Sequence, residues 1–124
     1  MAADINGLTQ SLKILQGAFT TPPETPTIIL LLTLAGRPDG TASMKELRQE
    51  IGLGSSSMTR QIGLLGMNGY RNGPNQSDIA GIGLVQSWED PVDRREKLVR
   101  LTPVGEALVA KALHPLKLNK SAGT

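Results

Sequence analysis

Hydrophobic residues at the start of the chain recur with the spacing of an amphipathic helix. Four of them lie three or four positions apart, on one side of a helix predicted over Ile5–Phe19: Leu8, Leu12, Leu15 and Phe19. A proline-rich link follows, in which Thr25 can cap a second helix that has Pro26 in its first turn. This second helix ends at Ala35 and is apolar nearly all round, so we expect it at the centre of the core.

Two short amphipathic helices separated by a glycine turn are predicted in the middle of the chain. Ser43 and Glu46 form a capping-box pattern, in which the serine accepts from a helical amide and the glutamate reaches back to the serine. The turn, over residues 52–54, contains two glycines, and the next helix begins at Ser55 or Ser56. A helix, a turn of about three residues and a second helix have the spacing of a helix-turn-helix motif.

The second half of the chain predicts a β-hairpin followed by one more helix. Two short segments, Leu84–Glu89 and Lys97–Leu101, flank a charged turn and are predicted as paired strands. A final helix over Pro103–Leu113 is expected to end at His114 and Pro115, because proline cannot donate the next helical hydrogen bond.

This order of elements divides the chain into three parts. Residues 1–25 form the first helix and its proline-rich link, residues 26–113 form the main folded unit, and residues 114–124 form a tail. The glycine-rich segment over residues 70–83 is interpreted as a loop inserted in the main unit. The expected fold class is mainly α with a small β-hairpin (α+β), arranged as a winged helix-turn-helix.

The composition excludes several classes of site. With 124 residues, 39% of them hydrophobic, the chain suits one folded domain and is not intrinsically disordered. It has no cysteine and one histidine, and no acid–base or nucleophile pair is evident, so we expect no enzyme, no metal site and no cofactor. The longest apolar run is too short for a bilayer and no signal peptide is evident, so we expect a cytoplasmic protein without a membrane partner. Three aromatic residues are too few for a platform that stacks single-stranded bases.

The predicted hairpin carries a more specific motif. Its turn, Asp90-Pro-Val-Asp-Arg-Arg-Glu96, is followed by a strand that leads into Leu101-Thr-Pro-Val-Gly105. This D-x-x-D-R-R pattern followed by L-T-x-x-G resembles the wing of the MarR family of transcriptional regulators. The helix-turn-helix over Ser43–Leu65 agrees with that family in spacing and position, so the resemblance covers about Pro26–Leu113, most of the chain.

The helix that begins near Ser55 is the expected recognition helix, because the second helix of such a motif enters the major groove with its first turn and outward face. Its candidate DNA contacts are Ser55, Ser56, Ser57, Thr59, Arg60 and Gln61. The hydroxyls are short enough to reach phosphates and bases, Arg60 can pair with guanine, and Gln61 can pair with adenine. Helix capping is the alternative role of each serine, and a solvated charge is the alternative for Arg60.

The wing contributes a second set of candidates. Arg94 or Arg95, on a narrow hairpin, can enter the minor groove, and Asp93 is the expected partner that orients a guanidinium. The resemblance implies that the wing arginines have this role, with Arg94 the first choice. Lys97 and Arg100 are expected to follow the DNA backbone. The alternative is a solvated hairpin of mixed charge.

The sequence therefore predicts a DNA-binding transcriptional regulator that acts as a repressor on double-stranded DNA. A homodimer is expected, with contacts through the outer helices, Ile5–Phe19 and Pro103–Leu113. A winged helix used for protein–protein assembly is the alternative, since the fold supports both roles and the net charge is only +2. The resemblance also implies a small aromatic acid as effector, but no polar group in the sequence identifies its pocket.

Overall fold

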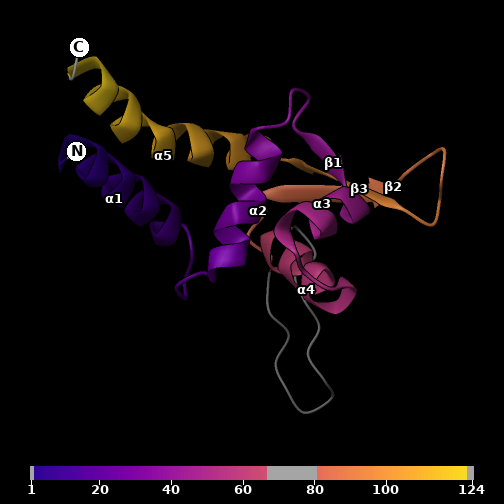
Figure 1. The fold of residues 1–124 in the computed structure, drawn as a ribbon. Coiled ribbons are helices and arrows are strands. Elements are labelled where there is room, and N and C mark those ends of the chain that lie inside the picture. Colours follow the sequence, from indigo (N-terminus) through magenta and orange to yellow (C-terminus); the bar gives the residue numbers. More distant parts are fainter. Residues whose placement is uncertain (1, 67–80, 123–124) are drawn as a thin grey trace.

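The computed structural model describes residues 2–66 and 81–122. In these ranges it contains five helices and one three-stranded antiparallel sheet (Figure 1). The helices are α1 (Ala2–Gly17), α2 (Thr25–Ala35), α3 (Met44–Ile51), α4 (Ser55–Leu65) and α5 (Pro103–Ala122). The strands are β1 (Thr41–Ser43), β2 (Val85–Glu89) and β3 (Lys97–Leu101). None of the described helices is long and apolar enough to cross a membrane.

The elements form two regions that differ in shape. Helices α2, α3 and α4 pack with the sheet, whereas α1 and α5 run side by side away from them (Figure 1). The turn between β2 and β3 projects from the opposite side of the molecule to the α1–α5 pair (Figure 1). We call this turn, residues 90–96, the wing.

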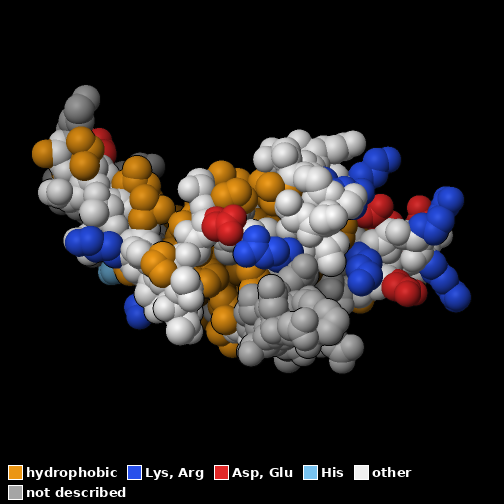
Figure 2. Space-filling model, turned by 90° about the horizontal axis from the view of Figure 1, so that it is seen from below, with side chains coloured by type: hydrophobic (Ala, Val, Ile, Leu, Met, Phe, Trp, Pro, Cys, Tyr) orange, Lys and Arg blue, Asp and Glu red, His pale blue; other side chains and the backbone are white. Residues whose placement is uncertain are grey.

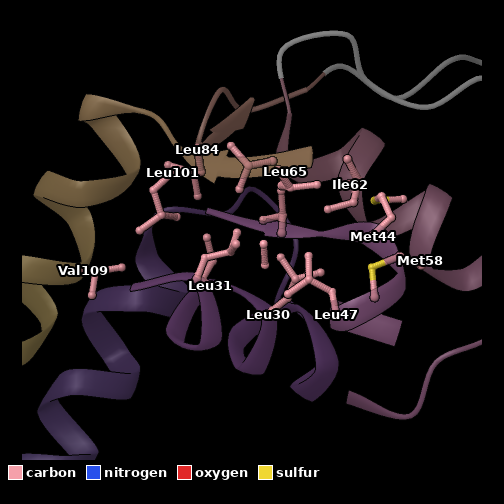
Figure 3. Packing of buried hydrophobic residues seen from close by; sticks show 14 residues of the cluster. Leu30, Leu31, Met44, Leu47, Met58, Ile62, Leu65, Leu84, Leu101 and Val109 are labelled. Atoms are coloured by element: carbon pink, nitrogen blue, oxygen red, sulfur yellow. The ribbon is translucent and has the colours of Figure 1, made fainter. Parts of the chain in front are cut away.

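The main core lies between the helices and the inner face of the sheet. Leu30 and Leu31 of α2 are fully buried and lie in one cluster with Leu65 of α4 (Figure 3). The sheet has the order β1-β3-β2, and Val99 in its central strand is also fully buried. Helix α2, which is apolar nearly all round, therefore occupies the predicted place at the centre.

Both strands of the predicted hairpin are confirmed, and a third strand joins them. Strand β2 begins one residue later than predicted, and β3 has the predicted bounds. Strand β1 pairs with β3, with Ala42 opposite Val99. Its three residues are too few to show the alternation of polar and apolar positions by which strands are identified in a sequence.

The first helix is present, but its predicted apolar face is wrong. Only Leu15 is buried, whereas Leu8 is 52% exposed and Leu12 is 41% exposed. The buried face also contains Gly7 and Ser11, and the hydroxyl of Ser11 donates to the Gly7 carbonyl at 3.0 Å. These small residues give α1 a flat face on the side that packs against α5.

Two predicted helix ends are also corrected. The N-cap of α2 is Glu24, without a side-chain capping bond, and Thr25 lies inside the helix. Helix α5 continues through Pro115 to Ala122, so the predicted stop at His114 and tail from residue 114 are wrong. Proline removes one helical hydrogen bond, but the packing of α5 along α1 favours continuation of the helix.

The end of the predicted glycine-rich loop and the residue that follows it are attached to the end of α4. Residues 67–80, most of the loop predicted over residues 70–83, lie outside the described residues. Its described end returns to α4, since the amides of Ile82 and Leu84 donate to the carbonyls of Leu64 and Leu65 at 3.2 and 2.7 Å. These hydrogen bonds place the start of β2 next to the end of α4.

Candidate nucleic-acid interface

The helix-turn-helix is held by local bonds that match the sequence pattern. Ser43 caps α3 by accepting from the Glu46 amide at 3.0 Å, and the Glu46 carboxylate accepts from the Ser43 amide at 3.2 Å, which confirms the capping box. This bond to the Ser43 amide is the main cause that holds the pKa of Glu46 below its ordinary value, and Arg37 adds a smaller effect. Gly52 then ends α3 with a left-handed φ of 81°, which glycine adopts without strain.

Helix α4 exposes a row of hydroxyl groups at its beginning. Ser55, Ser56, Ser57 and Thr59 are exposed, while Met58 on the opposite face is fully buried. The N-cap is Gly54, and no side chain caps the helix, so the capping role of the serines is not observed. The amides of the first turn have no acceptor within the helix, and amides in that position favour an anion.

Gln61 does not belong to this exposed surface. Its side chain is 3% exposed and accepts a hydrogen bond from the hydroxyl of Thr27, which is 4% exposed. The expectation that Gln61 faces outward is wrong, because its position on α4 turns it toward α2 rather than toward solvent. The residue instead joins α4 to the core, since a buried polar pair is costly to break.

Arg60 is exposed but has an acidic neighbour. Its guanidinium lies 3.6 Å from the Glu24 carboxylate, and both side chains are about half exposed. An exposed pair of this kind contributes little to stability, so Arg60 can exchange Glu24 for another anion at low cost.

Basic side chains gather at the wing end of the molecule, with acidic side chains between them (Figure 2). Arg94, Arg95 and Lys97 are all exposed, and the Arg95 side chain is 94% exposed. Within the described residues, Arg94 and Lys97 have no ion pair. In the described part of the chain, no acidic side chain therefore pairs with either of these two positive charges.

Asp93 lies against Arg95 rather than Arg94. Its Oδ1 atom accepts from the Arg95 amide at 3.2 Å and lies 3.4 Å from Arg95 Nε. A single oxygen takes both contacts, so the pair is not bidentate. The guanidinium of Arg94 remains unrestrained by this carboxylate.

Arg100 lies on the outer face of the sheet, behind the wing. Its guanidinium is 5.6 Å from the centre of the Trp88 ring, which is within the range of a cation–π contact. Trp88 itself is half-buried.

A hollow of about 300 Å³ lies between the link that joins α1 to α2 and one side of α4. Phe19, Pro22 and Leu64 contribute to its apolar lining, and Arg60 lies at the same hollow. The lining residues come from the link between α1 and α2, the first turn of α2, helix α4 and Ile82. No charged side chain in the hollow is deeply buried.

Comparison with known proteins identifies the fold. No protein-family model and no curated protein matches the chain. Among solved structures, AbsC, a MarR family transcriptional regulator from Streptomyces coelicolor, matches with a TM-score of 0.60 and 16% identity over 99% of this chain and 74% of AbsC. Sco3205, a MarR family regulator from the same organism in complex with DNA, matches with a TM-score of 0.59 and 19% identity over 95% of this chain and 66% of Sco3205.

A mutant of MarR from E. coli, complexed with operator DNA, has a TM-score of 0.57 and 18% identity over 90% of this chain and 66% of that protein. The chain has a MarR-like winged helix-turn-helix fold. The fold class expected from the sequence is confirmed. In the MarR-like fold, α4 is the second helix of the helix-turn-helix and β2–β3 is the hairpin of the wing.

Proposed function

We propose that the protein is a sequence-specific regulator of transcription that binds double-stranded DNA and acts as a repressor. Helix α4 enters the major groove with its exposed hydroxyls and Arg60, and Arg94 enters the minor groove from the wing. The main support is that the exposed hydroxyls of α4 and the Arg94 side chain of the wing have no partner among the described residues, in a fold whose solved examples include DNA complexes. Arg95 and Lys97 add positive charge beside the groove.

The major-groove contact is supported by the chemistry of α4. Three consecutive hydroxyls at its first turn suit phosphate oxygens and base edges, and one turn later Arg60 provides a fork of donors that fits guanine. The burial of Gln61 removes one predicted base contact but fixes the rotation of α4 on the core. A fixed rotation presents the same side chains to every site, which sequence-specific recognition requires.

The experiment that tests this function is selection from a library of random duplexes at two salt concentrations. We expect enrichment of a symmetric sequence whose half-sites are about one helical turn apart, because a two-fold dimer places two recognition helices at that spacing. Affinity is expected to fall as the salt concentration rises. Absence of any enriched sequence would favour the alternative, a winged helix that assembles with another protein.

A homodimer is proposed from the outer helices. Ile5, Leu8 and Leu12 on α1 are 56%, 52% and 41% exposed, and Val104 at the start of α5 is 62% exposed. The three α1 residues recur at the three- and four-residue spacing that places them on one side of that helix, beyond the face that packs on α5. A second copy of the chain can cover this apolar surface, which the rest of the described chain leaves open.

The double variant Leu8→Lys and Leu12→Lys is expected to be monomeric, because two charges in an apolar interface would have to be desolvated. Its affinity for a palindromic duplex is expected to fall at least tenfold, because a monomer binds one half-site whereas a dimer binds both. Analytical ultracentrifugation and fluorescence anisotropy measure the two effects. The control is Leu32→Lys on α2, a leucine of similar exposure (39%) outside the outer helices. An unchanged sedimentation coefficient in the double variant would place the interface elsewhere.

We propose a small aromatic acid as the effector, because the resemblance to the MarR family implies one. The hollow beside α4 lies between that helix and the link from α1 to α2, and Arg60 in its lining can pair with a carboxylate. A ligand bound there would compete with DNA for Arg60.

A further inference from the structure

Glu96, the last residue of the wing, contacts the helix-turn-helix directly. Its Oε1 atom accepts a hydrogen bond from the backbone amide of Lys45 at 2.9 Å. Lys45 is the second residue of α3, far from the wing in sequence but next to it in space. Among the described residues, this is the one side-chain hydrogen bond that joins the wing to a helix.

The contact continues the sheet beyond the point where its strands separate. Strands β1 and β3 pair up to Ser43 opposite Leu98, and the chain then turns into α3. The Glu96 side chain reaches the helix that β1 leads into. Its carboxylate therefore accepts from an amide just beyond the end of the β1–β3 ladder.

The Lys45 amide is available because the capping box does not use it. Ser43 accepts from the Glu46 amide, one residue later, and the amides of a first helical turn have no acceptor within the helix. A carboxylate at this end of a helix is also favoured by the helix dipole. Two glutamates therefore bond at the start of α3, Glu46 from the helix itself and Glu96 from the wing.

The backbone of Glu96 is fixed at the same time. Its carbonyl accepts from the Asp90 amide at 3.0 Å, and its amide donates to the Asp93 carbonyl at 2.9 Å. One residue thus closes the wing turn with its backbone and attaches it to α3 with its side chain. A change in the side-chain contact would be transmitted to the turn that carries Arg94 and Arg95.

We infer that Glu96 is a positioning residue, which fixes the wing relative to the helix-turn-helix so that the wing arginines and α4 reach adjacent grooves together. This inference rests on the proposed function and adds a residue that does not touch DNA. A bare carboxylate next to the wing would repel phosphates, so its presence there is explained by the bond to α3.

The test compares Glu96→Ala with Glu96→Gln, because the glutamine amide keeps an oxygen in place to accept from Lys45. Without DNA, the exchange rate of the Lys45 amide, measured by NMR, is expected to rise in Glu96→Ala and to stay near that of the unchanged protein in Glu96→Gln. With DNA, Glu96→Ala is expected to weaken binding about three- to tenfold. Its hydroxyl-radical footprint should lose protection in the outer minor groove and keep protection where α4 binds.

Glu89→Ala is the matched control. Glu89 is an exposed acid on β2 close to the wing. Its side chain has no ion-pair partner among the described residues, and its removal changes the net charge by the same amount. Since losing a negative charge near DNA favours binding, this variant is expected to bind as well as the unchanged protein or slightly better. A Glu96→Ala variant that behaves like Glu89→Ala, or that leaves Lys45 exchange unchanged, would overturn the inference. An unchanged protein that binds no duplex at all would instead overturn the proposed function.

Discussion

Replacement of both Arg94 and Arg95 by alanine is expected to lower the affinity for the selected duplex about 10- to 100-fold. The two guanidinium groups are exposed at the wing and contribute nothing to the core, so folding should be unchanged. Each group that contacts DNA displaces counterions, so the slope of log affinity against log salt should become shallower by up to about two. Anisotropy titrations at several salt concentrations measure both effects.

The single variants separate the two arginines. Arg94 has no acidic partner among the described residues, whereas Arg95 Nε lies 3.4 Å from Asp93. Arg94→Ala is therefore expected to account for most of the loss in affinity. The control is the pair Lys13→Ala and Lys111→Ala, which removes two exposed charges from α1 and α5. If the control and the arginine double variant bind DNA equally well, the wing does not contact DNA.

Local sequence patterns predicted the elements that depend on neighbouring residues. Ser43 and Glu46 are three residues apart, so a capping box needs nothing beyond its own helix, and both of its bonds are present. The hairpin strands were likewise predicted from two short segments on either side of a charged turn. Such features are determined by residues that lie close together in the sequence.

The wrong predictions concern elements whose structure depends on packing between segments that are far apart in the sequence. Leu8 and Leu12 have the spacing of a buried stripe, but α5 packs on the side of α1 that carries Gly7 and Ser11. Pro115 would end an isolated helix, yet α5 continues past it beside α1. Tertiary packing outweighs local preference in both cases, and no pattern in one segment reveals its partner.

The same limit applies to the candidate interface. The exposed hydroxyls of α4 follow from its helical period, whereas the burial of Gln61 depends on Thr27, 34 positions earlier. Glu96 was not a candidate, because its contact with Lys45 joins residues 51 positions apart. The acidic residues on either side of the wing arginines, Asp93 and Glu96, were the available signal, since a carboxylate beside arginines that contact DNA needs a partner of its own.

These contacts show how a chain of low net charge can present a basic surface. Three of the acids close to the proposed interface are engaged within the protein: Asp93 with Arg95, Glu24 with Arg60, and Glu96 with the Lys45 amide. Arg94 and the first turn of α4 then remain for an anionic partner. Local arrangement, rather than a net charge of +2, determines the field that DNA would meet.

The Gly105→Ala variant is expected to lose about 3 kcal/mol of unfolding free energy, because a methyl group has no space at this position. A Cβ atom built on Gly105 would lie 2.1 Å from the Leu84 carbonyl oxygen and 3.3 Å from a side-chain carbon of Leu101. The nearest atom belongs to the backbone and cannot rotate away. Accommodation would therefore require α5 to move from the segment that leads into β2.

Movement of α5 would also break the bonds that attach its first turn. Thr102 accepts from the Gly105 amide at 3.1 Å, its hydroxyl donates to the Gly83 carbonyl at 2.6 Å, and its amide donates to the Leu84 carbonyl at 3.0 Å. The threonine and glycine of the L-T-x-x-G motif thus act together, the first by bonding to residues 83–84 and the second by permitting the close approach. This arrangement explains the motif by packing rather than by contact with DNA.

Urea denaturation followed by circular dichroism and by Trp88 fluorescence measures the change. The matched control is Gly17→Ala at the end of α1, where an added Cβ meets no atom within 4 Å. Because alanine favours a helix over glycine by up to about 1 kcal/mol, the control should be unchanged or slightly more stable. If Gly105→Ala unfolds at the same urea concentration as Gly17→Ala, the first turn of α5 cannot be packed on Leu84 as closely as the structure shows.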